Sequence, residues 1–304
     1  MNHFLDIGQL SYSEITALIQ RALDFKNKGV YPSYPAFPVI HLFYENSTRT
    51  RVSFELAATH LKMPVINLDL QSSSESKGEV IEDTVKTLAA MGIKLFVIRH
   101  AEDGVPRHLA ETCGKGIHIV NAGAGAHAHP SQAMLDFMTI VEKKPHLTRL
   151  KIAIVGNIRH SRVANSLQCI AEKLGVGELT LVAPKLWQPE LIHYGRATTS
   201  LEEGLHQADV VICLRVQRDR LSMNETLDLT SYRKDYALTQ HTLAYAKKDV
   251  MVMHPGPINR GVEIDSDVAD GPQSYILQQV HNGVFMRMAI LEALVQHAAL
   301  PDHQ

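Results

Sequence analysis

The feature that most constrains the fold of this chain is a regular alternation of strand-like and helix-like runs along its 304 residues. Short apolar runs between turn residues predict buried strands, and runs with apolar residues every three or four positions predict amphipathic helices. Strands are expected near residues 39–43, 64–69, 94–98, 117–120, 151–155, 179–183, 209–214 and 250–253. Helices are expected after Ser11 or Ser13, near 50–61, 79–91, 131–142, 162–174, 201–207 and 238–246, and over 273–299 with an interruption at Asn282-Gly283.

This pattern predicts an α/β protein with two doubly wound domains, each with a mostly parallel sheet flanked by helices. Alternating elements favour such sheets because the connecting helices cover both faces. The length also suggests two domains, since single hydrophobic cores stop growing near ~250 residues. We expect the two domains to join near residues 133–146, after which a second strand–helix series begins.

The first predicted strand is followed by Ser47-Thr48-Arg49-Thr50-Arg51, which opens a helix. A helix N-terminus offers backbone N–H donors without helical partners and the positive end of the helix dipole. Two hydroxyls and the fork of Arg49 can add charge-assisted contacts, so this segment predicts a phosphate-binding site. The alternative is an ordinary N-cap with surface arginines, and the polar groups at other strand ends favour the phosphate site.

Those other groups follow the carboxyl ends of strands, where parallel α/β sheets bind ligands. They are Arg99, His129 and Gln132 in His129-Pro130-Ser131-Gln132, Arg162, Arg215 with Gln217, and Pro255 with Gly256. Arg215 and Gln217 are two apart in an extended segment, so their side chains leave the same face and suit a carboxylate. Each arginine taken singly is typical of a solvated surface, but together they predict an anion-binding edge.

A polar, Ser-rich segment connects a strand to a helix at residues 71–78. Its composition is typical of a flexible linker, but Lys77 beside Gly78 could deliver a compact positive charge on a moving loop. Both interpretations remain open from the residues alone.

Composition excludes several classes of function. Hydrophobic content of 45%, charged content of 20% and a net charge of −2 are typical of an ordinary globular protein and argue against a general nucleic-acid or membrane surface. Cys113, Cys169 and Cys213 lie far apart, which predicts neither disulfides nor a structural zinc site. Without a basic-then-apolar start or a membrane-length apolar run, we expect a cytoplasmic protein.

No cofactor or metal is expected. The run from Lys151 to Gly156 resembles the opening of a dinucleotide fold, but it continues Asn157-Ile-Arg without the glycine pattern. His127-Ala128-His129 has no neighbouring carboxylate and is a weak metal motif. A nucleotide-dependent oxidoreductase is therefore disfavoured.

Together, these motifs resemble the aspartate/ornithine carbamoyltransferase family over residues 4–299. Ser47-Thr48-Arg49-Thr50 is similar to the family's phosphate motif, Arg99 to its strand-end arginine, and His129-Pro130-Ser131-Gln132 to its His-Pro-x-Gln. The resemblance implies a carbamoyl phosphate-binding domain of residues 1–134, on which the C-terminal helix 285–304 packs, and an aspartate-binding domain of residues 135–284.

The second substrate decides between the two branches of the family. The ornithine branch typically has His-Cys-Leu-Pro near its last strand, whereas this chain has His254-Pro255-Gly256-Pro257. Ser73 and Lys77 look like the loop residues that the aspartate branch donates from a neighbouring subunit. Gly256 stands where the best-studied bacterial members have leucine. Because the contact there is mainly through backbone, we do not expect a loss of activity, but the change makes an allosteric partner less certain.

The resemblance implies carbamoyl transfer from carbamoyl phosphate to the α-amine of L-aspartate, which gives N-carbamoyl-L-aspartate and phosphate for de novo pyrimidine biosynthesis. The implied catalytic residues are Arg49, Thr50, Lys77, Arg99 and His129. The implied carbamoyl phosphate-binding residues are Ser47, Thr48, Arg49, Thr50, Ser73, Arg99, His129 and Gln132. The implied aspartate-binding residues are Lys77, Arg162, Arg215, Gln217, Pro255 and Gly256.

The resemblance also implies a homotrimer with active sites shared between subunits. It is compatible with a larger assembly that includes regulatory or dihydroorotase-like chains. Two alternatives stay open: a carbamoyltransferase for another amino acid, and a catalytically inactive homologue that acts as a binding subunit.

Overall fold

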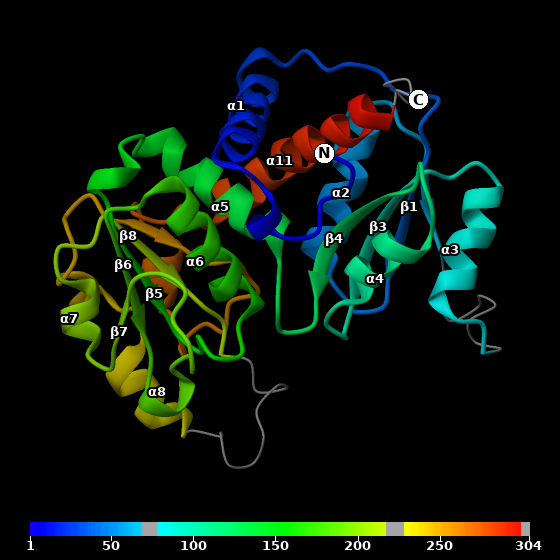
Figure 1. Ribbon diagram of the computed structural model, residues 1–304. Coiled ribbons are helices and arrows are strands. Elements are labelled where there is room, and N and C mark those ends of the chain that lie inside the picture. The colour runs from blue at the N-terminus through cyan, green and yellow to red at the C-terminus, as the bar shows by residue number, and fades with distance from the viewer. Residues whose placement is uncertain (69–77, 217–227, 299–304) are drawn as a thin grey trace. The chain divides into compact units, whose positions relative to one another are not determined.

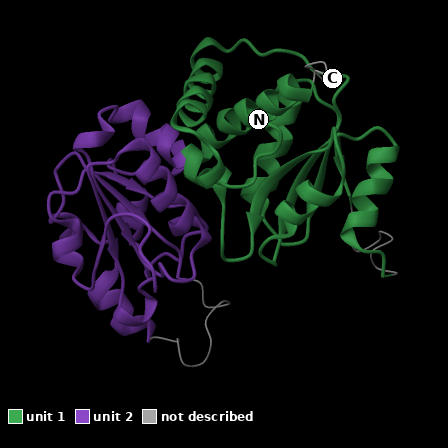
Figure 2. Cartoon of the chain, in the orientation of Figure 1, with its two compact units in different colours: residues 1–135, 280–304 green, residues 136–279 purple. Residues whose placement is uncertain are grey.

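The computed structural model describes residues 1–68, 78–216 and 228–298. The chain forms two compact units, one of residues 1–135 and 280–304 and the other of residues 136–279 (Figure 2). It passes from one unit to the other within two helices, α5 (Pro130–Lys143) and α11 (Ile276–Ala298). Each unit contains a parallel sheet flanked by helices, so the predicted fold class is confirmed (Figure 1).

The first unit is built on a four-stranded parallel sheet with the strand order β2–β1–β3–β4. Its strands are β1 (Val39–Phe43), β2 (Val65–Asn67), β3 (Leu95–His100) and β4 (His118–Ala124). The chain adds β2 on one side of β1 and then returns to add β3 and β4 on the other. The topological switch point therefore lies between β1 and β3, and ligands bind beyond the carboxyl ends of strands at such a point.

Helices α1 (Tyr12–Lys28), α2 (Thr48–His60), α3 (Ile81–Ala90) and α4 (Val105–Thr112) belong to the first unit. Ser11, one of the two predicted caps, begins α1 with a capping box. Its Oγ accepts the Glu14 N–H at 3.2 Å, and the Glu14 carboxylate accepts the Ser11 N–H at 2.8 Å. The N-terminal segment pairs with β4, since the Phe4 N–H donates to the Ile119 carbonyl at 2.8 Å.

The second unit has a five-stranded parallel sheet with the strand order β7–β6–β5–β8–β9. Its strands are β5 (Lys151–Val155), β6 (Glu178–Val182), β7 (Arg196–Thr198), β8 (Val210–Cys213) and β9 (Met251–Met253). As in the first sheet, later strands are added on both sides of the first one, which here is β5. The switch point of this sheet lies between β5 and β8.

The helices of the second unit are α6 (Arg162–Leu174), α7 (Leu201–Leu205), α8 (Leu229–Tyr236), α9 (Gln240–Leu243) and α10 (Ser266–Ala269). The sequence did not predict α4 in the first unit or α10 in the second, and it also did not predict α8 or β7. Only two tyrosines, Tyr232 and Tyr236, form the buried face of α8, and β7 is a three-residue strand with arginine and threonine at its ends. Neither element has enough apolar residues to show a periodicity.

The predicted interruption of the last helix at Asn282-Gly283 is wrong, because α11 is continuous through both residues. A Cβ at position 283 would lie 2.6 Å from Arg287 Nη1 and 3.2 Å from Leu135 Cδ2. Glycine at this position therefore makes room for a neighbouring side chain instead of ending the helix.

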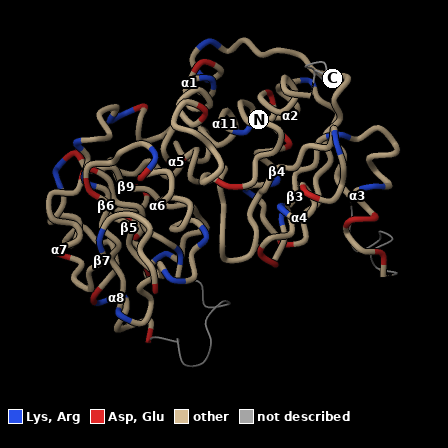
Figure 3. Tube along the Cα trace, in the orientation of Figure 1, with Lys and Arg blue, Asp and Glu red and all other residues tan. Residues whose placement is uncertain are grey.

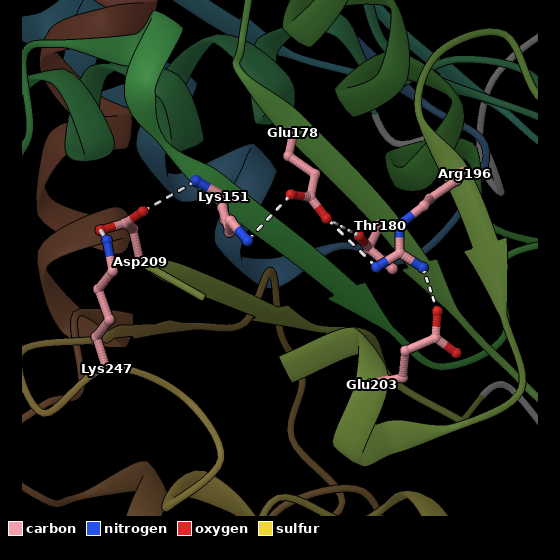
Figure 4. A network of polar contacts seen from close by, with 7 residues as sticks. All are labelled: Lys151, Glu178, Thr180, Arg196, Glu203, Asp209 and Lys247. Carbon is pink, nitrogen blue, oxygen red and sulfur yellow. Dashed lines mark hydrogen bonds and ion pairs between the residues drawn. The ribbon is translucent and has the colours of Figure 1, made fainter. Parts of the chain in front are cut away.

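Alternating charges join the amino ends of the strands in the second unit (Figure 4). At the start of β5, Lys151 Nζ lies 3.3 Å from Oε2 of Glu178, and the other carboxylate oxygen, Oε1, lies 3.3 Å from Arg196 Nη2. Asp209 accepts the Lys151 N–H at 2.9 Å and the Lys247 ammonium at 2.7 Å. The network stabilises the amino edge of the sheet and leaves the carboxyl edge to ligands.

The carboxylate of Glu178 shows how this network depends on pH. Burial raises the pKa of Glu178, but hydrogen bonds and charges from Lys151 and Arg196 outweigh burial and hold the pKa below its usual value. A carboxyl group with a depressed folded-state pKa stabilises the fold above its unfolded pKa and loses that contribution as the pH falls through the folded one. This contribution is therefore lost only in acid.

Replacing Asp209 by alanine is expected to lower the free energy of unfolding by about 1–3 kcal/mol, because a buried acceptor of a backbone N–H and an ammonium is removed. Its side chain is only 7% exposed. Asp249→Ala is the matched control, since Asp249 also pairs with a lysine, Lys144, but is 74% exposed and should contribute under ~1 kcal/mol. Urea unfolding of both variants measures the difference, and equal losses would contradict this account of the network.

Basic and acidic residues are interspersed along the described trace of both units (Figure 3). Within the described residues, no helix combines the length and apolar character needed to cross a membrane.

Candidate active site

The residues of the predicted phosphate site lie at the start of α2, in the first unit. Ser47 is the N-cap residue of α2, but its side chain makes no capping hydrogen bond, and the first turn contains no acidic residue. The first amides of a helix have no partner within the helix, and in α2 the Ser47 side chain does not cap them. Thr48 and Arg49 are exposed and Thr50 is buried, so the segment presents both surface and interior groups at one helix end.

Arg99 lies beside this helix start, at the end of the neighbouring strand. In the β1–β3 pair Arg99 is aligned with Phe43, the last residue of β1. Its side chain is 10% exposed, Nη1 donates to the Ala122 carbonyl at 3.1 Å, and Nη2 lies 3.2 Å from a carboxylate oxygen of Glu45. The guanidinium is therefore held at the switch point by Glu45, which stands two residues before Ser47. Sequence reasoning missed Glu45, although an acidic residue just before the Ser-Thr-Arg motif was a visible signal.

His129 and Gln132 lie in one buried turn at the start of α5, which follows β4. The Gln132 N–H donates to the His129 carbonyl at 3.1 Å, so the two residues are fixed in a single turn. β4 is the neighbour of β3, and both are parallel to β1. The first unit thus brings the helix start, Arg99 and this turn to the same edge of one sheet, as predicted.

His127, the other histidine of the weak metal motif, is hydrogen-bonded to Asp6. His127 Nε2 lies 3.1 Å from a carboxylate oxygen of Asp6, and this hydrogen bond raises the pKa of His127. Among the described residues, no group of three histidine, cysteine or acidic side chains is placed to hold a metal ion.

In the second unit, two arginines follow the strands on either side of the switch point. Arg162 is the first residue of α6, after β5, and is 5% exposed. Arg215 follows β8, the neighbour of β5, and its buried Nε finds no hydrogen-bond acceptor among the described residues. Two cations at one switch point are groups of the kind that bind carboxylates.

The loop after β9 contains Pro255 and Gly256, and its shape depends on His254. The Gly256 N–H donates to His254 Nδ1 at 2.8 Å, and Gly256 has φ +72°, a backbone conformation that favours glycine. Because Nδ1 accepts, Nε2 carries the proton, and it lies 3.2 Å from an oxygen of Glu263.

Glu263, which sequence reasoning also missed, connects this loop to the segment that carries Arg215. Its side chain is fully buried, and Oε1 accepts the Asn259 N–H at 2.6 Å. Asn259 Nδ2 donates to the Val216 carbonyl at 3.2 Å, one residue after Arg215. A buried carboxylate thereby fixes two ligand-facing segments in the second unit.

Three predicted site residues, Ser73, Lys77 and Gln217, lie outside the described residues. Their predicted roles stay predictions.

Comparison with known families defines the class to which this two-unit α/β protein belongs. Residues 2–142 match the family model described as aspartate/ornithine carbamoyltransferase, carbamoyl-P binding domain, and residues 148–294 match the Asp/Orn binding domain. The chain belongs to the aspartate/ornithine carbamoyltransferase family, as its motifs predicted.

Individual relatives of the chain belong to the same family. The chain is 65% identical over 295 residues to a protein of Legionella pneumophila named aspartate carbamoyltransferase catalytic subunit, with 97% of this chain and 99% of the relative covered. It is 46% identical to a protein of that name from Coxiella burnetii, with 95% of each covered. Its fold is similar to that of Trypanosoma cruzi aspartate transcarbamoylase in complex with carbamoyl aspartate and phosphate, at a TM-score of 0.86 and 29% identity, with 95% of each chain covered. Ornithine carbamoyltransferase from Pyrococcus furiosus gives a TM-score of 0.83 at 25% identity, with 95% of this chain and 96% of the other covered.

Proposed function

We propose that this chain has aspartate carbamoyltransferase activity: it transfers the carbamoyl group of carbamoyl phosphate to the α-amine of L-aspartate. The products are N-carbamoyl-L-aspartate, for de novo pyrimidine biosynthesis, and phosphate. The observation that carries the proposal is the uncapped helix start at residues 47–50 beside Arg99, at the switch point of the first sheet. Relatives of that name at 65% and 46% identity support it.

The site residues suggest how the first substrate is held. We propose that Ser47, Thr48, Arg49 and Lys77 bind the phosphate, with Ser73 in the same loop as Lys77. The helix dipole and charge-assisted hydrogen bonds both favour an anion at this point. We propose that Gln132 binds the carbamoyl amide, because its side chain carries a carbonyl acceptor for an NH₂ group.

We propose that the carbamoyl group is then transferred directly from phosphate to the amine. The amine of aspartate attacks the carbonyl carbon, and the carbonyl oxygen takes negative charge in a tetrahedral intermediate. Thr50, Arg99 and His129 stabilise that oxygen by hydrogen bonds and charge, which is the kind of preorganised interaction that lowers acyl-transfer barriers most. The C–O bond to phosphate breaks, and the leaving phosphate accepts the amine proton.

The second unit supports aspartate as the acceptor. Arg162 and Arg215 provide two cations for the two carboxylates of aspartate, with Gln217 and the Pro255-Gly256 backbone beside them. Ornithine would bring an ammonium group to the same cations, which is unfavourable. On this basis the first unit binds carbamoyl phosphate and the second binds the amino acid.

We also propose that the chain works as a cytoplasmic homotrimer in which Ser73 and Lys77 reach the active site of the neighbouring subunit. The support is the similarity of these two residues to the donated loop of the aspartate branch. Relatives named as catalytic subunits make further partner chains, regulatory or dihydroorotase-like, compatible with this proposal.

The binding of N-(phosphonacetyl)-L-aspartate, which joins both substrates in one molecule and is bound in a Trypanosoma cruzi relative, tests this proposal. Calorimetry on the purified chain should find it bound at least ~100-fold more tightly than the same phosphonacetyl group on ornithine, as expected for an analogue that spans both subsites. Sedimentation of the same sample should give the mass of three chains. Equal affinities would contradict aspartate as the acceptor, and tight binding by a single chain would contradict the shared site.

A further inference from the structure

Arg287 is a buried arginine of α11 with contacts on two other helices of the first unit. It is only 3% exposed, and it is not part of the binding motifs. Its Cζ lies 5.0 Å from the centre of the Phe54 ring of α2, and Nη2 lies 3.3 Å from Ser131 Oγ of α5. Nη1 donates to the carbonyl of Gly283 at 3.2 Å, in its own helix.

The two helices that Arg287 contacts carry the two halves of the proposed carbamoyl phosphate site. Phe54 is four residues after Thr50, so both lie on the same face of α2, and both are buried. Ser131 is fully buried and stands between Pro130 and Gln132, in the turn that begins with His129. One planar guanidinium therefore touches the interior face of the phosphate-binding helix and the turn that holds the carbamoyl group.

The surroundings of Arg287 are shaped to keep it in place. A Cβ at position 283 would lie 2.6 Å from Nη1, so the glycine leaves the space that the guanidinium fills. Burying a guanidinium costs free energy that an apolar side chain of similar volume would avoid. The forked geometry of arginine, which a lysine cannot reproduce, suits simultaneous contact with a hydroxyl, a carbonyl and an aromatic face.

We propose that Arg287 is a positioning residue for carbamoyl phosphate: it fixes the His129–Gln132 turn relative to the start of α2. It touches neither substrate nor reacting atoms and acts through Ser131 and Phe54. The inference rests on the proposed function, which it deepens. A misplacement of about 1 Å in such a site can lower the rate by ~10²-fold, so loss of this link should be visible in kinetics.

The test compares Arg287→Met with Arg21→Met. Arg21 also stacks on a phenylalanine, Phe25, at 4.1 Å, and also binds α11, through Glu292 at 2.6 Å, but these contacts lie on α1 and α11 and not on α2 or α5. Both variants should lose thermal stability. Only Arg287→Met should lower kcat/KM for carbamoyl phosphate, by about 10- to 100-fold, with the KM for aspartate changed less than threefold.

Two further measurements test the positioning role of Arg287. Ser131→Ala, which removes only the hydroxyl acceptor, should lower kcat/KM in the same direction, and adding it to Arg287→Met should cause little further loss. Calorimetry with inorganic pyrophosphate probes the anion site without turnover and should show about tenfold weaker binding to Arg287→Met alone. Equal kinetics and pyrophosphate affinity in the Arg287→Met and Arg21→Met proteins would overturn the positioning role. An inactive wild-type protein would instead refute the proposed function, and pyrophosphate binding would still decide the role of Arg287.

Discussion

Replacing Arg49 by alanine is expected to remove nearly all carbamoyl transfer while leaving the fold intact. Arg49 is exposed in the first turn of α2, so its removal opens no cavity in the core. Loss of one preorganised donor to the developing charge typically lowers kcat by ~10²–10³-fold. Phosphate release measured on the purified variant, with its thermal melting recorded beside the wild type, checks both halves of this expectation.

Arg51 provides the matched control, two positions further along the same helix. It is also exposed, and its Nε lies 3.5 Å from a carboxylate oxygen of Glu55 in an i,i+4 pair. Such surface pairs contribute only a few tenths of a kcal/mol, so Arg51→Ala should retain turnover within a few fold of the wild type. Near-normal turnover in a folded Arg49→Ala protein, or equal losses in both variants, would contradict the phosphate-binding role of this helix start.

The sequence predicted the sheets well because their strands are continuous apolar runs. The range expected near 39–43 is β1, and the range expected near 151–155 is β5. β7 and α8 were missed because short elements with polar ends carry no clear periodicity. Gly283 was misread as a break because a sequence does not show that a buried arginine fills the space beside it.

The residues proposed to contact the ligand could be predicted from position, since strand ends and a helix start are visible in sequence. Residues that orient those groups were not, because their role depends on contacts between distant segments. Glu263 lies about 50 residues after Arg215 in sequence and joins their segments through Asn259 and through its own contact with the Val216 N–H at 3.5 Å. Arg287 lies 156 residues after Ser131, and nothing in the local pattern of α11 distinguishes it.

Aspartate should be carbamoylated at least ~100-fold more efficiently than ornithine, because a site built to bind a charged group discriminates strongly against a substrate that lacks it. In the proposed roles, Arg162 and Arg215 attract the carboxylates of aspartate. The same two cations repel the ammonium group at the end of the ornithine side chain, which is charged at neutral pH. Arg215→Ala should reduce this preference, mainly by raising the KM for aspartate.

The most direct test of carbamoyl transfer to aspartate is a product analysis with the purified chain, carbamoyl phosphate and equal concentrations of aspartate, ornithine and other amino acids. Chromatography with mass detection identifies each carbamoylated product, and released phosphate is measured in the same samples. The proposed function predicts N-carbamoyl-L-aspartate as the dominant product, in amounts equal to the phosphate released. Preferential formation of carbamoylated ornithine or of another carbamoylated amino acid, or no product above the reaction without protein, would contradict it.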